Sequence, residues 1–274
     1  METLLSGYVF PEAPRVDAAG TLYFSDIIGG GVHRRTADGS VDTVIPKRRG
    51  VGGLVLHAEG GLVVSGRDVV HVRDGVSRPL LMVDGALGFN DLTTDAQGRV
   101  YVGSMRSMAD VLDGRVPGEL WRIDAAGQDR ALYRDVDFPN GVGFSPDGRT
   151  LYHSNYSGGH VLAHTIAADG RATDRRIFAT MPRGRPDGLA VDEDGGVLVA
   201  LGDARGVARF RSDGTLDRVV PVPGAFVASL CFGGDDRRDL YVVGVADAVD
   251  PARAGTVWRT RVDVAGLVAP PARV

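Results

Sequence analysis

Tight turns recur along the chain at a nearly constant spacing, and this repeat limits the fold more than any other feature of the sequence. At 192–196, for example, a turn rich in Asp and Gly separates the apolar run 189–191 from the run 197–201. Because Asp side chains bond their own backbone and Gly tolerates positive φ, such a segment predicts a β-hairpin. Comparable turns begin at positions 17, 57, 95, 145, 192 and 233.

A second series of turns lies between the first ones, at 38–39, 74–75, 124–127, 169–170, 213–214 and 263–266. Two hairpin turns in each unit require four strands, and the six units begin 38 to 50 residues apart. Four-stranded repeats of about 40–50 residues are typical of β-propeller blades. The sequence therefore predicts an all-β fold, a single six-bladed β-propeller domain over 1–274 with four antiparallel strands per blade.

Composition excludes several classes of protein. The net charge is −4, and the one dense basic run is Lys47-Arg48-Arg49, so nothing favours nucleic-acid binding. A single cysteine, Cys231, excludes an intramolecular disulfide, and its apolar surroundings indicate an inert buried thiol. The N-terminus has no basic signal-peptide region, and no apolar run is long enough to span a bilayer. We expect a cytoplasmic protein that binds neither nucleic acid nor membrane.

The repeat also predicts which side chains share one place. The first strand of each propeller blade lines the central channel, so equivalent residues of the blades form a ring. The residues five positions before the first turns, called the ring residues below, are Glu12, Gly52, Asn90, Asn140, Asp187 and Ala228. Four of these six carry side-chain oxygens, and the other two are small. At any one position such a residue could simply cap a loop, but four of six favour a common site.

The composition of the ring favours a metal ion. Two carboxylates that face a common centre repel each other unless a cation or protons intervene. An oxygen-only set without His or Cys suits Ca²⁺, and Mg²⁺, Mn²⁺ and Zn²⁺ are alternatives. The small Gly52 and Ala228 leave room for water or a small-molecule substrate. No Ser-His-Asp arrangement competes, and we interpret His33, His71 and His153, which lie in strand-like segments, as structural.

Two connections are longer than a hairpin needs. They span 106–119, between the second and third strands of blade three, and 246–255, at the same place in blade six. Long loops in compact domains are often functional, although surface loops also drift in length. Second strands return to the same mouth of the channel, where we expect Asp26, Ser104, Asn155 and Asp203. Arg106 begins the blade-three loop there, either as a substrate ligand or as a solvated loop residue.

Short motifs surround the ring residues: Glu12 with Pro14, Phe89-Asn90-Asp91, Pro139-Asn140-Gly141, Pro186-Asp187-Gly188 and Cys231-Phe232-Gly233-Gly234. As a set they resemble the senescence-marker-protein/gluconolactonase family of calcium-dependent, regucalcin-like lactonases, across essentially the whole chain. The resemblance implies that Glu12, Asn140 and Asp187 hold a divalent metal. It also implies that Asn90 lies beside the metal, in contact with substrate or metal-bound water, and that Asp187 is the general base.

The resemblance implies hydrolysis of a lactone or related ester, with the cation polarising the carbonyl and a carboxylate taking a proton from water. We assign catalysis to Asp187 and Asn90, and substrate binding to Asn90, Asp91, Arg106 and Asn155. Members that act on sugar lactones often carry an arginine where this chain has Gly88, which places a sugar lactone in doubt. The alternatives are metal-assisted chemistry on another electrophile, such as a phosphoester or a biosynthetic intermediate, and a non-catalytic binding propeller with a structural ion. The oligomeric state is not predicted.

Overall fold

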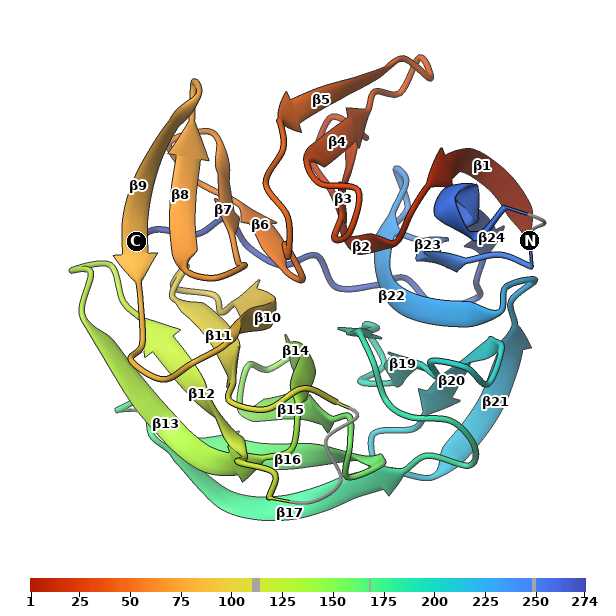
Figure 1. Cartoon of the computed structure of the whole chain (residues 1–274). Coiled ribbons are helices and arrows are strands. Elements are labelled where there is room, and N and C mark those ends of the chain that lie inside the picture. The colour runs from red at the N-terminus through yellow and green to blue at the C-terminus, as the bar shows by residue number, and fades with distance from the viewer. Residues whose placement is uncertain (110–113, 168, 248–249) are drawn as a thin grey trace.

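The chain forms six four-stranded antiparallel sheets that stand as blades around a central channel (Figure 1). The computed structural model describes residues 1–109, 114–167, 169–247 and 250–274. Within each of the first five blades the strands are hydrogen-bonded in sequence order, from the channel outward. The predicted all-β, six-bladed architecture is confirmed.

The strands of the first three blades follow the two series of turns. Blade one contains β2 (Pro11–Val16), β3 (Leu22–Asp26), β4 (Val32–Arg35) and β5 (Val41–Ile45). Blade two contains β6 (Leu54–Leu56), β7 (Leu62–Val64), β8 (Val69–Arg73) and β9 (Val76–Leu81). Blade three contains β10 (Gly88–Thr94), β11 (Val100–Met105), β12 (Gly118–Ile123) and β13 (Asp129–Val136).

The next two blades repeat this order. Blade four contains β14 (Pro139–Phe144), β15 (Thr150–Asn155), β16 (His160–Ile166) and β17 (Ala172–Thr180). Blade five contains β18 (Leu189–Val191), β19 (Val197–Ala200), β20 (Gly206–Phe210) and β21 (Leu216–Pro221). The hydrophobic core lies between neighbouring blades: Tyr152 and Val161 of blade four, for example, pack in one cluster with Val197 and Val199 of blade five.

Blade six is completed by the N-terminus. Its own strands are β22 (Phe226–Gly233), β23 (Asp239–Val245) and β24 (Gly255–Arg261), and its outer strand is β1 (Glu2–Tyr8), which pairs antiparallel with β24. The prediction that 263–266 is a hairpin turn leading to a fourth strand is wrong, because no strand follows β24 in residues 262–274. Pairing the first strand with the last closes the ring of blades.

The two long connections lie where the sequence places them, between β11 and β12 and between β23 and β24. Residues 110–113 and 248–249, which belong to these predicted loops, are outside the described residues. The second loop contains the short 3-10 turn η1 (Pro251–Arg253). Within the described ranges, no helix has the length and apolar character to cross a membrane.

The inner strands carry a repeated irregularity at the ring residues. The ladder to the second strand slips by one residue between Glu12 and Arg15, between Phe89 and Leu92, between Pro139 and Val142, and between Val227 and Ser229. Such β-bulges turn a side chain away from the regular alternation of a strand. At Ala13 the bulge uses a φ of 51°, which is unusual for a residue with a side chain. Four ring residues thus lie in or beside bulges.

Residues 262–274 cross the end of the channel opposite to the ring residues. The backbone N–H of Leu267 bonds to the carbonyl of Val191 at 2.9 Å, and the N–H of Ala272 bonds to the carbonyl of Leu56 at 2.7 Å. The tail therefore runs from blade five to blade two, and Figure 1 shows it passing through the centre to end beside β9. This tail covers the far end of the channel, whereas the ring residues lie at the other end, called the mouth below.

Candidate active site

Both carboxylates of the ring are buried at the mouth. Glu12 is the second residue of β2, and Asp187 lies two residues before β18; their exposed fractions are 6% and 4%. The backbone between blades is also joined here, because Gly141 N–H bonds to the Asp187 carbonyl at 3.2 Å. The Gly188 N–H bonds in turn to the Ala228 carbonyl at 2.8 Å. These bonds hold the ring residues of blades four, five and six together.

Burial makes negative charge costly at this place. Desolvation, followed by the charge of Asp91, raises the pKa of Glu12 to about 8. Desolvation raises the pKa of Asp187 well above its usual value, and the charges of Glu12 and Asp91 raise it further. A hydrogen bond from the Asn140 side chain opposes the second shift. The charge of Glu12 is thus felt at Asp187, and that of Asp91 at both carboxylates.

Two carboxamides complete the group. The Asn90 side-chain nitrogen donates to the Pro139 carbonyl at 3.1 Å, which leaves its oxygen Oδ1 turned away from that bond. A Cβ atom at Gly52 would lie 2.1 Å from this oxygen, so Asn90 requires glycine at the ring position of blade two. The Asn140 amide donates to Asp187, and its own carbonyl oxygen is thereby left for another partner.

These residues fit a hard divalent cation. Asp187 Oδ1 is buried and has no hydrogen-bond partner in the described part of the chain. A buried carboxylate oxygen without a partner is costly, and a cation would satisfy it. Among the described residues, neither this site nor any other brings together three or more His, Cys, Asp or Glu side chains in a cluster suited to a metal ion. A cation at the mouth would therefore depend on the amide oxygens of Asn140 and Asn90 as well as on the two carboxylates.

The predicted rim residues differ in what their side chains do. Asp26 accepts hydrogen bonds from the N–H groups of Val9, Phe10 and Gly29, so it fixes loops between blades six and one. Ser104 is fully buried and donates to Glu119 Oε2 at 2.5 Å. Asn155 accepts from Gly158 N–H at 3.2 Å, and its amide lies 3.3 Å from His160 Nε2. A substrate contact at Asn155 would replace one of these bonds. Asp203 is exposed.

Arg106 is neither free nor simply solvated. Its Nε donates to Glu119 Oε1 at 2.7 Å, and its Nη1 donates to the Asp84 carbonyl at 3.0 Å. Glu119 is buried, so this ion pair neutralises a carboxylate that would otherwise be unpaired. The side chain joins the blade-three loop to the connection between blades two and three.

The mouth contains two residues that the repeat does not identify. Tyr156 directly follows Asn155, and the guanidinium of Arg185 lies 5.6 Å from the centre of its ring. Burial, followed by the charge of Asp187, raises the pKa of Tyr156 to about 12, so its hydroxyl stays protonated near that carboxylate. Both residues lie in connections at the mouth, outside the ring positions, and only their closeness in sequence to Asn155 and Asp187 points to them.

Asp91 lies deeper than a residue on the rim. It is 2% exposed, and its Oδ1 accepts from Leu92 N–H at 2.9 Å and from Arg15 Nη2 at 3.5 Å. Burial raises its pKa to about 6, and Arg15 opposes this shift. Asp91 therefore lies between the ring residues and Arg15. Its charge raises the pKa values of Glu12 and Asp187, and its carboxylate contacts Arg15 on the side of the channel interior.

Gly88 is required by the packing of two blades. Its φ is 159°, and a Cβ atom there would lie 2.8 Å from the Gly66 carbonyl oxygen. The neighbouring Phe89 N–H donates to the same carbonyl at 2.6 Å. An arginine at this position would push the backbone of blade two away, so this chain has no room for the side chain that Gly88 replaces.

Comparison with known proteins identifies the family of the chain. The chain is 31% identical to a 6-deoxy-6-sulfogluconolactonase from Pseudomonas putida, over 91% of this chain and 89% of that protein. It is 30% identical to a pentonolactonase from Haloferax volcanii, over 89% and 88%. The calcium-binding protein regucalcin from Agrobacterium tumefaciens has the same fold, with a TM-score of 0.85, 22% identity and coverage of 100% and 97%. Residues 10–246 match the family described as the SMP-30/Gluconolactonase/LRE-like region, and the chain belongs to this family.

Proposed function

We propose that this protein hydrolyses a lactone or a related ester at the mouth of the channel, using a divalent cation. The observation that supports this most directly is the pair of buried carboxylates, Glu12 and Asp187, beside two carboxamides and with one carboxylate oxygen unpartnered. The family and its lactonase members support the same reaction. We further propose that Glu12, Asn140 and Asp187 hold the cation.

The cation, when bound, supplies positive charge that polarises a lactone carbonyl. Asp187 is the proposed general base, because one of its oxygens can face the cation while the other accepts a proton from water. Asn90, held by its bond to the Pro139 carbonyl, presents its oxygen toward the same space and orients water or substrate. Tyr156, with Arg185 over its ring, lies close enough to Asp187 for that charge to raise its pKa, and we propose that this pair borders the substrate.

The nature of the donors favours calcium. All proposed ligands are oxygens, which hard cations prefer, and a regucalcin of the same fold is described as calcium-binding. The relatives act on a sulfogluconolactone and on pentonolactones, so lactones of sugar acids are the first substrates to test. The absence of a side chain at Gly88 means that any such sugar is held by other residues, among which we propose Asn90, Asp91, Arg106 and Asn155.

The proposal also covers the domain organisation and the cellular location of the protein. We infer that 1–274 acts as one domain, which the pairing of β1 with β24 and the tail across the channel support. We also propose a cytoplasmic location, which the buried free thiol of Cys231 supports, because such a thiol needs no oxidising compartment.

A substrate screen tests the reaction. Protein loaded in turn with Ca²⁺, Mg²⁺, Mn²⁺ and Zn²⁺ is assayed in a pH-stat against sugar lactones, aliphatic lactones, aryl esters and phosphotriesters. We expect cation-dependent turnover of at least one lactone, lost on chelation. Turnover of phosphotriesters alone would assign chemistry on a different electrophile, and binding of a cation without any turnover would indicate a binding propeller.

A further inference from the structure

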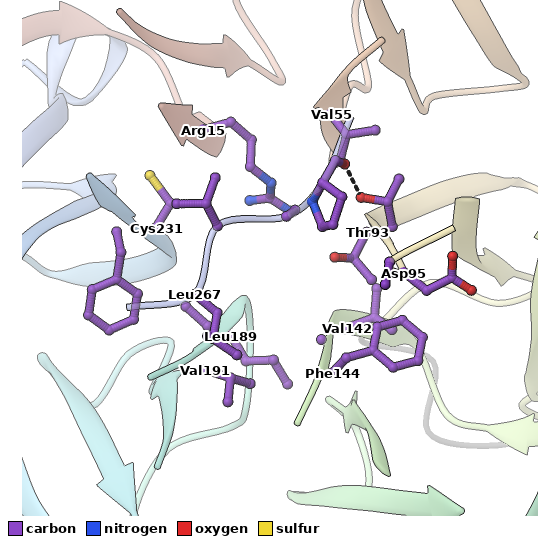
Figure 2. A pocket seen from close by; sticks show the side chains of 18 of the residues that line it. Arg15, Val55, Thr93, Asp95, Val142, Phe144, Leu189, Val191, Cys231 and Leu267 are labelled. Atoms are coloured by element: carbon purple, nitrogen blue, oxygen red, sulfur yellow. Dashed lines mark hydrogen bonds between the residues drawn. The ribbon is translucent and has the colours of Figure 1, made fainter. Parts of the chain in front are cut away.

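A cavity of about 290 Å³ lies inside the channel, between the inner strands and the C-terminal tail. It is at the end opposite to the ring residues, since its lining comes from the last residues of the inner strands, the first turns and the tail segment 267–270. Figure 2 shows these side chains surrounding one space. The volume is close to the lower limit of about 300 Å³ that is usual for small-molecule sites.

The wall of this cavity is mostly apolar. Val142, Leu189, Val191 and Leu267 contribute aliphatic groups, and Phe144 contributes a ring (Figure 2). Pockets that bind small organic molecules combine such a surface with a few polar groups that fix orientation. A ligand held here therefore has an apolar body.

One cation faces the cavity. Arg15 extends from β2 toward the middle of the space (Figure 2). Its Nη1 donates to the Pro14 carbonyl at 2.7 Å and its Nη2 to the Leu92 carbonyl at 2.9 Å, which hold the guanidinium in place. Its Nε–H makes no hydrogen bond in the described part of the chain, and its contact with Asp91 is long, at 3.5 Å. Arg15 thus has a donor left for an anion.

Three other polar side chains of the lining bear on an acidic ligand. The exposed Asp147 carboxylate accepts from the Ser145 hydroxyl at 2.6 Å and from Arg149 N–H at 3.0 Å, which turn it toward its own loop. Thr93 lines the cavity, and its hydroxyl makes no hydrogen bond within the described residues. The carboxylate of Asp95 is already taken up by Arg99 Nε at 2.6 Å and by the Tyr101 hydroxyl at 2.9 Å. The negative charge of Asp95 is therefore compensated locally and does not oppose an anion at Arg15.

We propose that this cavity is a second binding site, distinct from the mouth, for a small monocarboxylic acid with an apolar body. The carboxylate lies against Arg15 and the Thr93 hydroxyl, and the apolar body lies among the side chains of blades four and five and under the tail. An arginine that receives a carboxylate in a water-poor space forms a strong, charge-assisted hydrogen bond.

Calorimetry with hexanoate tests the site, with hexanol and hexylamine as matched probes of the same chain length. The experiment uses the full chain loaded with Ca²⁺. We expect hexanoate to bind at least about tenfold more tightly than either analogue, which corresponds to one charge-assisted hydrogen bond. Equal binding of hexanoate and hexanol would overturn the proposal, since the cavity would then be an unselective apolar void.

Substitutions in and away from the cavity show where hexanoate binds. Arg15→Met should weaken hexanoate binding at least about tenfold, the same factor as above, and Arg15→Lys should restore part of it. Ala190→Leu fills the cavity without touching Arg15 and should weaken binding to a similar extent, which keeps the test valid if Arg15→Met folds poorly. Arg171→Met, on the exposed outer turn of blade four and outside the lining, is the control and should bind as the parent does. Hexanoate that instead binds to the cation at the mouth would be unaffected by Arg15→Met and Ala190→Leu, and that result would refute the site.

Discussion

At the mouth of the channel lie Glu12 and Asn140, near the starts of their inner strands, and Asp187, just before β18. Toward the far end the same strands present Arg15, Val142 and Val191. Glu12 and Arg15 are three residues apart on one strand. At the mouth, Glu12 and Asn140 lie in or beside bulges and belong to a buried group of carboxylates and carboxamides. At the far end, the surface is mostly apolar, and its charged side chains are Arg15, Asp95 and Asp147.

This difference follows from the geometry of a propeller. Each inner strand runs along the channel from the mouth to the far end, so the residues at its start and at its end meet different sets of neighbours. Register irregularities are confined to the start, where they free side chains from packing between blades. The ends remain regular and are covered by the tail. One ring of blades can therefore hold a polar site at one end and a mostly apolar one at the other, and the following experiments test whether the two ends are independent.

The largest expected effect separates the two carboxylates at the mouth. Asp187→Asn keeps the shape and one carbonyl ligand, so we expect metal affinity to be largely retained while turnover falls by about 100-fold or more, the scale of general-base catalysis. Glu12→Gln should show the reverse, with weaker metal binding and turnover restored by excess cation. Turnover at saturating metal and calcium titrations measure both. Ala228→Ser, at the ring position of blade six, is the control for metal binding and should keep the calcium affinity of the parent.

If excess cation restores Asp187→Asn to near the turnover of the parent, Asp187 is only a ligand. The base would then have to be sought among the other residues at the mouth, beginning with the region of Tyr156 and Arg185.

The second prediction concerns pH. Glu12 titrates at about 8 in the folded protein and near 4.5 when unfolded, so its raised pKa favours folding fully below pH 4.5. As pH rises from 4.5 through 8 that stability is lost, because the unfolded chain gives up a proton that the folded chain retains. We expect chelated protein to lose on the order of 1 kcal/mol per pH unit in this window. Added Ca²⁺ should remove the slope, and thermal melts at pH 5, 6.5 and 8 with and without Ca²⁺ measure it. Parallel melting curves in the two conditions would contradict a cation at Glu12.

A third prediction concerns the loss of folding stability at acidic pH, which we assign to a histidine away from both ends of the channel. Burial, with the charges of His164 and Arg175, lowers the pKa of His153 to about 3, and its Nδ1 lies 2.8 Å from the Tyr133 hydroxyl. The depressed pKa contributes stability above pH 6.5 that is lost as pH falls toward 3, about 2 kcal/mol at pH 5. His153→Gln should therefore melt with a smaller change between pH 7 and pH 5 than the parent. An unchanged difference would assign this loss of stability to other groups.

Much of this architecture could be predicted because it is local. A hairpin turn is encoded by a few residues, and a fixed offset from each turn is enough to bring Glu12, Asn140 and Asp187 to one mouth. The closure of blade six could not be predicted in the same way. Its outer strand, β1, pairs with residues more than 240 positions away, and no turn marks that pairing. The turn-like residues 263–266 were therefore interpreted as a hairpin, although they begin the tail.

The contents of the site show the same limit. Tyr156 and Arg185 meet because two connections at the mouth lie side by side, and no repeat specifies that contact. The sequence leaves Arg106 as either a substrate ligand or a solvated loop residue, whereas the structure pairs it with the buried Glu119, because a buried carboxylate needs a nearby cation. Pairings of this kind depend on how deeply each side chain is buried and on which loops lie side by side, and neither follows from a fixed spacing in the sequence.

The smallest expected effect tests the independence of the far end. The Thr94 hydroxyl donates to the Pro270 carbonyl and so fastens the tail to blade three. Thr94→Val removes the donor with little change of shape, and losing one such hydrogen bond costs about 1 kcal/mol. Because Thr94 is at the end of β10 and the ring residue Asn90 is near its start, we expect turnover and calcium affinity to stay within about twofold of the parent, a difference that corresponds to less than 0.5 kcal/mol. Denaturant unfolding measures the loss of stability, and the lactone assay measures the turnover. A large loss of turnover with only the small loss of stability would show that the tail acts on the mouth through the inner strands, and the two ends of the channel would then have to be treated as one coupled site.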